Sequence, residues 1–255
     1  MFDVVVIGSG PAGYVAAIRA SQLGLKTLCI EELSNDKGKP NFGGTCLNVG
    51  CIPSKSLLDS SHRYYDAKKN LSDHGIQLGD VKLDLKTMME RKDNIVSKLT
   101  GGIDGLFLTN KVESICGKGK VISKNTVQID KADGSSEKVD AKNIIIATGS
   151  SPIEIPAASF GKHIVDSTGA LAFDSVPKRL GVVGAGIIGL ELGSVWSRLG
   201  SEVTVIEALE DFLPMTDTDI SKESLKEFKK QGLDIQLASK AVSYTHLTLP
   251  TKPSG

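Results

Sequence analysis

The sequence has no excess of charge of either sign and few cysteines for its length. Thirty Lys and Arg residues balance thirty Asp and Glu residues in a chain of 255. This balance offers no electrostatic footprint for nucleic acid or an anionic membrane, so we expect neither as a partner. Four cysteines are too few for a secreted disulfide scaffold, and none stand in the CxxC pairs of a zinc site. We therefore expect no metal centre.

Long hydrophobic runs and a targeting segment are also lacking. The longest weakly polar run, residues 180–196, is short, rich in glycine and interrupted by Glu191, so it does not predict a membrane span. The N-terminus enters a predicted strand at Phe2 without a basic region, which indicates no signal peptide. We expect a cytoplasmic protein of one or two domains, with enough apolar residues for a sizeable core.

What the sequence does contain begins with a glycine-rich turn between two apolar runs. Residues 2–7 predict a buried strand, a helical pattern then stops at Gly24, and residues 27–30 predict a second strand that ends at Glu31. A GxGxxG dinucleotide site requires this order of elements, namely strand, glycine turn, helix, strand and acid.

Each glycine of this turn has a physical role in such a site. Gly8 would make the tight turn, Gly10 would let the backbone approach a pyrophosphate, and Gly13 would let helix and strand pack closely. The phosphates would lie at the helix N-terminus, where free N–H groups and the helix dipole favour negative charge. Glu31 would accept hydrogen bonds from ribose hydroxyls.

The whole unit recurs 176 positions later, so the chain is predicted to bind two dinucleotides. Glu207 occupies the position that would meet a 2′-phosphate, and its carboxylate would repel one; no arginine follows it closely. The second site should therefore prefer NAD to NADP. The residues identical at this offset are Gly184, Gly186, Gly189, Leu199, Gly200, Ile206 and Glu207, matching Gly8, Gly10, Gly13, Leu23, Gly24, Ile30 and Glu31.

The rest of the chain predicts alternating helices and short strands. A hairpin turn is expected at Asp133-Gly134, a strand end at Thr148-Gly149, and a linker from residue 151 to Pro156. Helices are expected at 54–68, 85–108 (bent by glycines at 101, 102 and 105) and 222–231, and strands at 112–116, 120–122, 126–129, 138–139, 143–147, 180–183, 203–206 and 234–237.

Two cysteines, Cys46 and Cys51, stand five apart in the segment GGTCLNVGCIPSK at residues 43–55. In a regular helix they would lie on different faces and beyond disulfide reach, so a bridge needs a distorted first turn or a loop. The glycines permit that distortion, and an adjoining helix N-terminus would lower a thiolate pKa. Spacing alone leaves a redox pair and two small buried residues equally open. Cys29 and Cys116, in strand-like runs, are expected in the core.

The order of these motifs resembles the pyridine-nucleotide:disulfide oxidoreductases, and within them the flavoproteins that serve 2-oxo acid dehydrogenase complexes. The resemblance covers residues 1 to about 242, the N-terminal half of such a subunit, and is most specific in the cysteine segment. It implies an α/β fold of two Rossmann-like, three-layer domains, both truncated: an FAD-binding domain at 1–150 and an NAD-binding domain at 151–242.

The resemblance also implies roles for individual residues. Cys51 would lie against the flavin and Cys46 would face the substrate. Lys55 would lie near the flavin ring and pair with Glu191, although a surface charge is the alternative for each. The FAD site would comprise Gly8, Gly10, Gly13, Glu31, Gly44, Thr45, Lys55, Thr148 and Gly149, and the NAD site would comprise Gly184, Gly186, Gly189 and Glu207.

The implied reaction oxidises protein-bound dihydrolipoamide, with electrons passing through a Cys46–Cys51 disulfide and FAD to NAD⁺. The implied partners are a lipoyl domain and, for the full-length family member, a second copy of the subunit. The family's catalytic histidine, however, belongs to a C-terminal interface domain, and no histidine here stands in such a motif. The four histidines are His62, His74, His163 and His246.

The final stretch, residues 243–255 (SYTHLTLPTKPSG), breaks off a strand–helix pattern and resembles translated sequencing-adapter read-through. We expect the native sequence to depart from the given one near Val242. Three alternatives therefore stay open beside the enzyme: a nucleotide-binding module without turnover, a relative of the glutathione or mercuric reductase type, and an apoprotein that does not fold stably.

Overall fold

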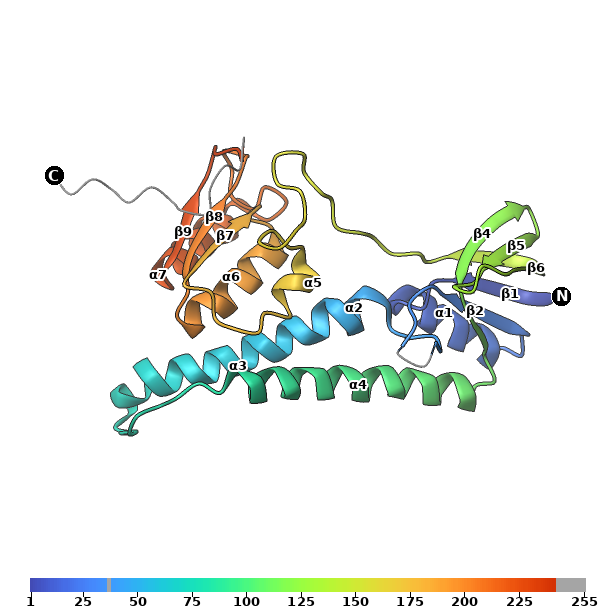
Figure 1. Cartoon of the computed structure of the whole chain (residues 1–255), viewed down its shortest axis with the longest axis horizontal. Helices are drawn as coiled ribbons and strands as arrows, with labels where there is room; N and C mark the ends of the chain where they lie inside the picture. Colours follow the sequence, from blue (N-terminus) through green and yellow to red (C-terminus); the bar gives the residue numbers. More distant parts are fainter. Residues whose placement is uncertain (36–37, 242–255) are drawn as a thin grey trace. The chain divides into compact units, whose positions relative to one another are not determined.

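The computed structural model describes residues 1–35 and 38–241, in two compact units. One unit comprises Met1–Ser56 and Glu90–Ser151, and the other comprises Leu57–Met89 and the chain from Pro152 onward. Figure 1 shows the elements of both units along the chain. The expected tail at 243–255, with His246, lies outside the described residues.

The first unit is organised on a parallel sheet in the strand order β3-β2-β1-β6. Its central strand β1 is paired on both sides, with Val5 opposite Leu28 and Ile144. Such a strand is buried on both faces, which explains its continuous apolar sequence. The strands are β1 (Phe2–Ile7), β2 (Thr27–Glu31), β3 (Glu113–Cys116) and β6 (Ser136–Ile146).

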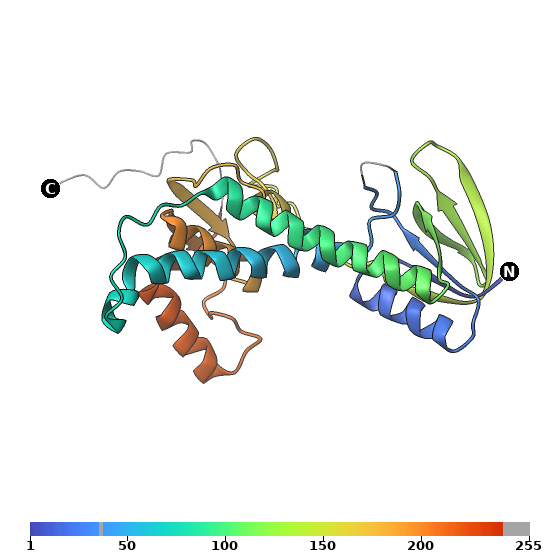
Figure 2. The same cartoon turned by 90° about the horizontal axis from the view of Figure 1, so that it is seen from below.

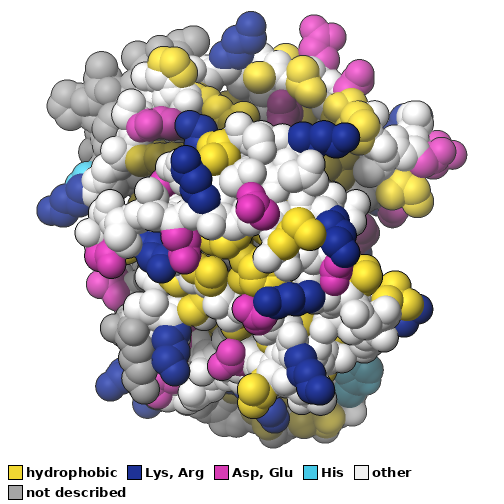
Figure 3. Space-filling view, turned by 90° about the vertical axis from the view of Figure 1, so that its right-hand side faces the viewer, with side chains coloured by type: hydrophobic (Ala, Val, Ile, Leu, Met, Phe, Trp, Pro, Cys, Tyr) yellow, Lys and Arg dark blue, Asp and Glu magenta, His cyan; other side chains and the backbone are white. Residues whose placement is uncertain are grey.

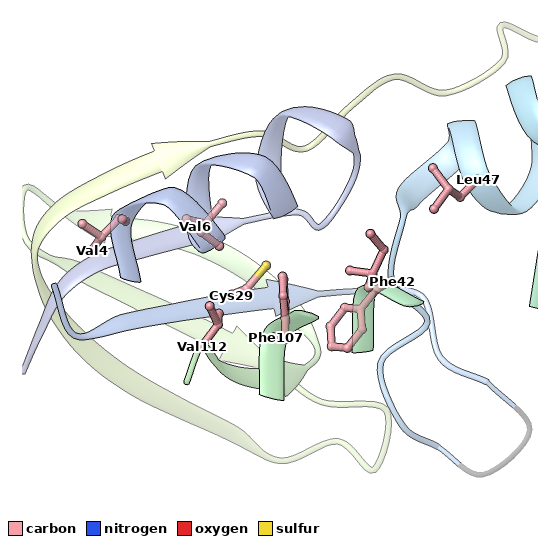
Figure 4. Packing of buried hydrophobic residues seen from close by; sticks show 10 residues of the cluster. Val4, Val6, Cys29, Phe42, Leu47, Phe107 and Val112 are labelled. Carbon is pink, nitrogen blue, oxygen red and sulfur yellow. The ribbon is translucent and has the colours of Figure 1, made fainter. Parts of the chain in front are cut away.

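Successive residues of β1 point to opposite faces of this sheet and contact different layers. Val4 and Val6 pack with residues of α1 (Pro11–Gln22) and the later turns of α4 (Leu85–Thr109), as Figure 4 shows from close by. Val5 and Ile7 pack under β5 (Thr126–Asp130), and Ile7 also lies against Gly119 of β4 (Lys118–Ser123). The unit therefore has three layers, with helices on one face of the parallel sheet and an antiparallel meander on the other.

One strand replaces two that the sequence predicted. Residues 138–139 and 143–147 were expected as separate strands, but β6 runs without a break from Ser136 to Ile146. Its first half pairs antiparallel with β5 and its second half pairs parallel with β1. The polar residues between the halves stay in the strand because its alternating side chains face solvent there. The turn at Asp133-Gly134 is confirmed: it joins β5 to β6, with Gly134 at φ +83°.

The helix α4 also differs from its prediction. It continues as one helix past Gly101, Gly102 and Gly105, and both views draw it without a kink there (Figures 1 and 2). Ile103 and Phe107 from the same turns are buried in the core, which holds the helix straight despite the low helix propensity of glycine.

The second unit is built on a three-stranded parallel sheet in the order β7-β8-β9. Two apolar clusters form its core, one around Val203 and Val205 and the other around Trp196. Leu57 and Met88 belong to the second cluster, which explains why Leu57–Met89 groups with this unit. The elements are α5 (Ser167–Ala170), β7 (Arg179–Val183), α6 (Ile187–Leu199), β8 (Glu202–Ile206), α7 (Thr218–Lys230) and β9 (Leu233–Gln236).

The helix α7 begins four residues before its predicted start. The Asp217 side chain accepts a hydrogen bond from the Asp219 backbone N–H at 2.9 Å and so caps the first turn. The division between Ser151 and Pro152 lies one residue from the domain boundary expected at 150, whereas Leu57–Met89 falls outside the first unit. The assignment of the two domains to FAD and NAD stays a prediction.

Charged side chains of both signs are interspersed over the face drawn in Figure 3. Among the helices of residues 1–35 and 38–241, none combines the length and the apolar character needed to cross a membrane.

Candidate functional site

The first glycine turn lies at the carboxyl end of β1 and leaves no room for side chains at two positions. Gly8 has φ +98°, and a Cβ on it would lie 2.2 Å from the Ala147 carbonyl oxygen. A Cβ on Gly13 would lie 1.9 Å from the Gly8 carbonyl oxygen. Both glycines are therefore required by the close packing of strand, turn and helix.

Gly10 differs from its neighbours because space is open beside it. The nearest described atom to a Cβ there is Gly44 Cα, at 3.9 Å. Gly10 is also the N-cap of α1, and no side chain of the described residues caps that helix end. An open backbone and uncapped N–H groups fit a pyrophosphate, since both favour a bound anion.

The acid at the end of β2 binds the glycine turn directly. Glu31 is 5% exposed, and its Oε2 accepts hydrogen bonds from the Ser9 backbone N–H at 2.9 Å and from the Ser9 hydroxyl. Its Oε1 accepts a hydrogen bond from the Leu33 N–H at 2.8 Å. Sequence reasoning missed Ser9 and this clamp, because a motif names the residue types but not the hydrogen bonds among them.

The second glycine turn repeats this arrangement after β7. Gly184 has φ +99°, and a Cβ on Gly189 would lie 2.4 Å from the Gly184 carbonyl oxygen. No described heavy atom lies within 4 Å of a Cβ built on Gly186. Glu207 accepts hydrogen bonds from the Ala185 N–H at 2.8 Å and the Leu209 N–H at 2.9 Å. The sequence repeat is therefore a repeat of structure.

Several predicted site residues of the first unit meet at the carboxyl edge of its parallel sheet. Gly8 follows β1, Glu31 ends β2, and Thr148 and Gly149 follow β6. The Ala147 N–H donates to the Ile7 carbonyl at 2.8 Å, which holds the ends of β1 and β6 together. Open α/β sheets bind ligands at this edge.

The cysteine segment forms two helices with a break between the cysteines. Cys46 lies in α2 (Gly44–Val49), Gly50 ends that helix, and Cys51 begins α3 (Cys51–Lys69). A Cβ on Gly50 would lie 2.9 Å from the Thr45 carbonyl oxygen and 3.3 Å from Cys46 Cα. The chain therefore turns back on Cys46, which brings Cys51 near enough to contribute to the raised pKa of the Cys46 thiol.

The electrostatics of the reduced thiols differ from the sequence prediction. Burial, followed by the hydrogen bond with Cys51, raises the pKa of Cys46 to about 11, and the Lys55 ammonium offsets only part of this. The expected lowering of the pKa by a helix N-terminus is wrong for Cys46: this residue lies in the first turn of α2, but burial outweighs any such effect. Cys46 is half-buried and Cys51 is exposed.

The remaining two cysteines differ in burial. Cys29 is fully buried in the core, as predicted, and burial and the Glu31 charge raise its pKa to about 12. Cys116 was also expected in the core but is only half-buried, because β3 is the edge strand of the sheet.

The cysteine helix is joined to the first glycine turn through Gly43 and Gly44. The Gly43 N–H donates to the Ser9 carbonyl at 3.0 Å, and a Cβ on Gly44 would lie 2.6 Å from Gly10 Cα. From the other side, the Asn48 amide donates to the carbonyls of Phe42 at 3.1 Å and Gly44 at 2.9 Å. Asn48 is a second positioning residue that the sequence did not reveal, since its side chain acts on the backbone.

Three further predicted residues have their surroundings only partly defined. Thr45 is exposed on α2, and Lys55 is exposed on α3, one turn after Cys51. Glu191 is half-buried on α6. Lys55 and Glu191 belong to different compact units, so their pairing stays a prediction.

The chain is similar to known redox proteins over nearly its whole length. The profile of the pyridine nucleotide-disulphide oxidoreductase family matches residues 2–248. Leghemoglobin reductase of Vigna unguiculata is 54% identical over 241 residues, which are 94% of this chain and 45% of that protein. Mitochondrial dihydrolipoyl dehydrogenase 1 of Arabidopsis thaliana is 53% identical over 94% of this chain and 46% of its own length.

A bacterial relative and a solved structure are likewise similar over nearly the whole of this chain. Dihydrolipoyl dehydrogenase of Cupriavidus necator is 53% identical over 92% of this chain and 50% of that protein. The HOCl-induced flavoprotein disulfide reductase RclA from Escherichia coli superposes with a TM-score of 0.76 at 28% identity, over 93% of this chain and 49% of that one. The chain spans about half the length of these relatives. On the profile match and these identities, it belongs to the pyridine nucleotide-disulphide oxidoreductase family.

Proposed function

We propose that this chain carries the nucleotide-binding and disulfide parts of a dihydrolipoamide dehydrogenase, which oxidises protein-bound dihydrolipoamide with NAD⁺ as acceptor. The observation that carries the proposal is the helix break at Gly50, which brings Cys46 and Cys51 together beside the first glycine turn. The names of the relatives at 50% identity or more support the same reaction.

FAD is assigned to the first site and NAD to the second. At both, open space beside the central glycine, Gly10 or Gly186, fits a pyrophosphate. Around the first site, Gly44 touches the glycine turn, while Thr45, Lys55, Thr148 and Gly149 are the further FAD-site residues that the sequence predicts. Glu207 favours NAD over NADP because a carboxylate repels a 2′-phosphate.

The cysteines perform the thiol chemistry. A substrate thiolate would attack Sγ of Cys46, forming a mixed disulfide and releasing Cys51 as a thiolate. The second substrate thiol then loses its proton to solvent and attacks the mixed disulfide, which closes the substrate disulfide and releases Cys46 as a thiolate. The substrate dithiol is oxidised and the cysteine pair is reduced by two electrons. FAD held at the first glycine turn would supply the two-electron acceptor for the reduced cysteine pair, and NAD⁺ at the second turn would be the final acceptor.

Partners and location follow from the same proposal. The dithiol substrate would be the dihydrolipoyl group on the lipoyl domain of a 2-oxo acid dehydrogenase complex, and a homodimer is the proposed assembly of the full-length protein. Lys55 would stabilise negative charge near the flavin, with Glu191 as its partner. A cytoplasmic location stays a prediction, since the relatives include proteins named mitochondrial and a bacterial protein.

Stopped-flow reduction of the FAD-loaded chain by dihydrolipoamide in the presence of NAD⁺ tests the proposal. Steady NADH production supports the enzyme, whereas a charge-transfer absorbance without NADH supports a nucleotide-binding module. Cys46→Ser and Cys51→Ser should abolish the absorbance change, and Cys116→Ser is the matched control that should keep it. Reduction that survives both cysteine changes would contradict the proposed role of the pair.

Two other outcomes separate the remaining alternatives. Reduction by NADPH or glutathione in preference to NADH and dihydrolipoamide would favour a glutathione reductase type of relative. Failure to retain yellow flavin through gel filtration would favour an apoprotein that does not fold stably.

A further inference from the structure

The two glycine turns differ at their middle residue. In the first turn this residue is Ser9, which is fully buried, and in the second it is Ala185, which is 2% exposed. Both donate a backbone N–H to Oε2 of the acid that follows the second strand, at 2.9 Å and 2.8 Å. Only Ser9 adds a side-chain hydroxyl, which donates to the same oxygen of Glu31.

This difference changes how many further hydrogen bonds each acid can accept. A carboxylate has about four acceptor positions, two on each oxygen. Glu31 uses three of them on described groups, namely both donors of Ser9 on Oε2 and the Leu33 N–H on Oε1. Glu207 uses two on described groups, the Ala185 N–H on Oε2 and the Leu209 N–H on Oε1.

The acceptor positions that remain on Glu31 and on Glu207 are therefore arranged differently. Within residues 1–35 and 38–241, Glu31 keeps one position, on Oε1, whereas Glu207 keeps one on each oxygen. A ribose presents two neighbouring hydroxyls, each of which can donate one hydrogen bond. A carboxylate with one position on each oxygen can bind both hydroxyls, and a carboxylate with a single position can bind one.

We infer that Ser9 and Ala185 are positioning residues that set this number, so that the second site binds both hydroxyls of a nucleotide ribose and the first site binds one. The inference rests on the proposed function, in which the two acids meet the ribose of bound dinucleotides. It makes Ala185 a specificity-determining residue, because without a hydroxyl at this position both Glu207 oxygens can accept a hydrogen bond from a ribose hydroxyl.

The test adds the hydroxyl to the second site. The whole chain and its Ala185→Ser variant are titrated with NADH, 2′-deoxy-NADH and 3′-deoxy-NADH (adenosine ribose), and binding is followed by nucleotide fluorescence. The unchanged chain should bind NADH about tenfold to 100-fold more tightly than either analogue, because a hydrogen bond to a charged group is lost. Ala185→Ser should weaken NADH binding by a similar factor and discriminate against only one of the analogues.

The control separates hydrogen bonding from size. Ala185→Cys adds an atom of comparable size that is a weak donor, so it should retain discrimination against both analogues. Equal loss in the serine and cysteine variants, or full discrimination by Ala185→Ser, overturns the inference while NADH binding by the unchanged chain leaves the proposed function standing. If the unchanged chain binds no NADH, the proposed NAD site and this inference both fail.

A reciprocal change covers the case in which Ala185→Ser does not fold. Ser9→Ala releases one acceptor position on Glu31, so the apoprotein should discriminate against FAD lacking one adenosine-ribose hydroxyl about tenfold more than the unchanged chain does. The quenching of flavin fluorescence on binding measures this ratio. An unchanged ratio overturns the inference.

Discussion

At the level of a single residue, replacing Gly189 tests whether the second glycine turn needs close backbone packing. A Cβ there would lie 2.4 Å from the Gly184 carbonyl oxygen and 2.9 Å from Val182 Cγ1. We expect Gly189→Ala to destabilise the second unit by about 3 kcal/mol, since neither neighbour can move without shifting β7 or the turn. The fluorescence of Trp196, the single tryptophan, measures this unfolding in urea because it is buried in that unit.

Gly186→Ala is the matched control for the same turn. Gly186 has an extended backbone, with φ −75° and ψ 172°, and no described heavy atom lies within 4 Å of a Cβ on it. The free energy of unfolding of Gly186→Ala should stay within about 1 kcal/mol of that of the unchanged chain, while dinucleotide binding weakens. Equal destabilisation by both changes would show that the two glycines do not have separate roles.

Cys29 links protonation to the stability of the first unit. Burial raises its pKa from the ordinary 9.0 to about 12, so the folded chain keeps a proton that the unfolded chain releases. The stabilisation is fully present below pH 9 and is lost as the pH rises toward 12, in total roughly 4 kcal/mol. Urea unfolding followed by circular dichroism should show a smaller loss between pH 9 and pH 11 in Cys29→Ala, and identical slopes would contradict the shift.

At the level of elements, the break between α2 and α3 decides whether the cysteines can meet. We expect Gly50→Ala to move Cys51 away from Cys46, because its Cβ would press on the Thr45 carbonyl and on Cys46 Cα. A cost of about 1.4 kcal/mol would lower the disulfide equilibrium constant against glutathione about tenfold. Quantitative thiol labelling across a series of glutathione ratios measures this constant.

Gly101→Ala provides the comparison on a helix without such a break. No described heavy atom lies within 4 Å of a Cβ on Gly101 in α4. This change should stabilise the helix by roughly 0.5–1 kcal/mol and leave the disulfide equilibrium unchanged. A Gly50→Ala variant that behaves like Gly101→Ala would mean that the break does not control the pairing of the cysteines.

The elements also show what the sequence could predict. The strand, turn and helix around Gly8, and their repeat around Gly184, were correct because the glycines and the apolar period are local signals. The continuity of β6 was missed because its polar residues resemble a loop when its two different neighbours are unknown. The bonds of Glu31 to Ser9 depend on how the turn lies over the end of β2, which no local pattern specifies.

At the level of the whole molecule, one stretch of the N-terminal part of the chain belongs to the second compact unit. The stretch Leu57–Met89 contributes Leu57 and Met88 to an apolar cluster with Leu171 and Trp196 of the second unit. The helical pattern of this stretch predicted an apolar face but could not tell which part of the chain covers it. The sequence therefore could not predict which compact unit these helices join.

Shortening the chain tests this division. We expect residues 1–151 alone to self-associate in gel filtration, because Leu57 and Met88 would lose the residues that bury them. Replacing both by glutamine in the shortened chain should restore a monomer. A shortened chain that stays monomeric without these changes would contradict the assignment of Leu57–Met89 to the second unit.

The clamp between acid and glycine turn also has a consequence for the history of the chain. In both copies the bond from the turn to the carboxylate spans 22 residues, so the glycine turn and the acid that it binds are encoded within one short stretch of gene. A duplication of that stretch would copy the glycine turn together with its acid, so the bond between them would form in the new copy as well. The later divergence of Ser9 and Ala185 would then be enough to fit the two copies to different occupants.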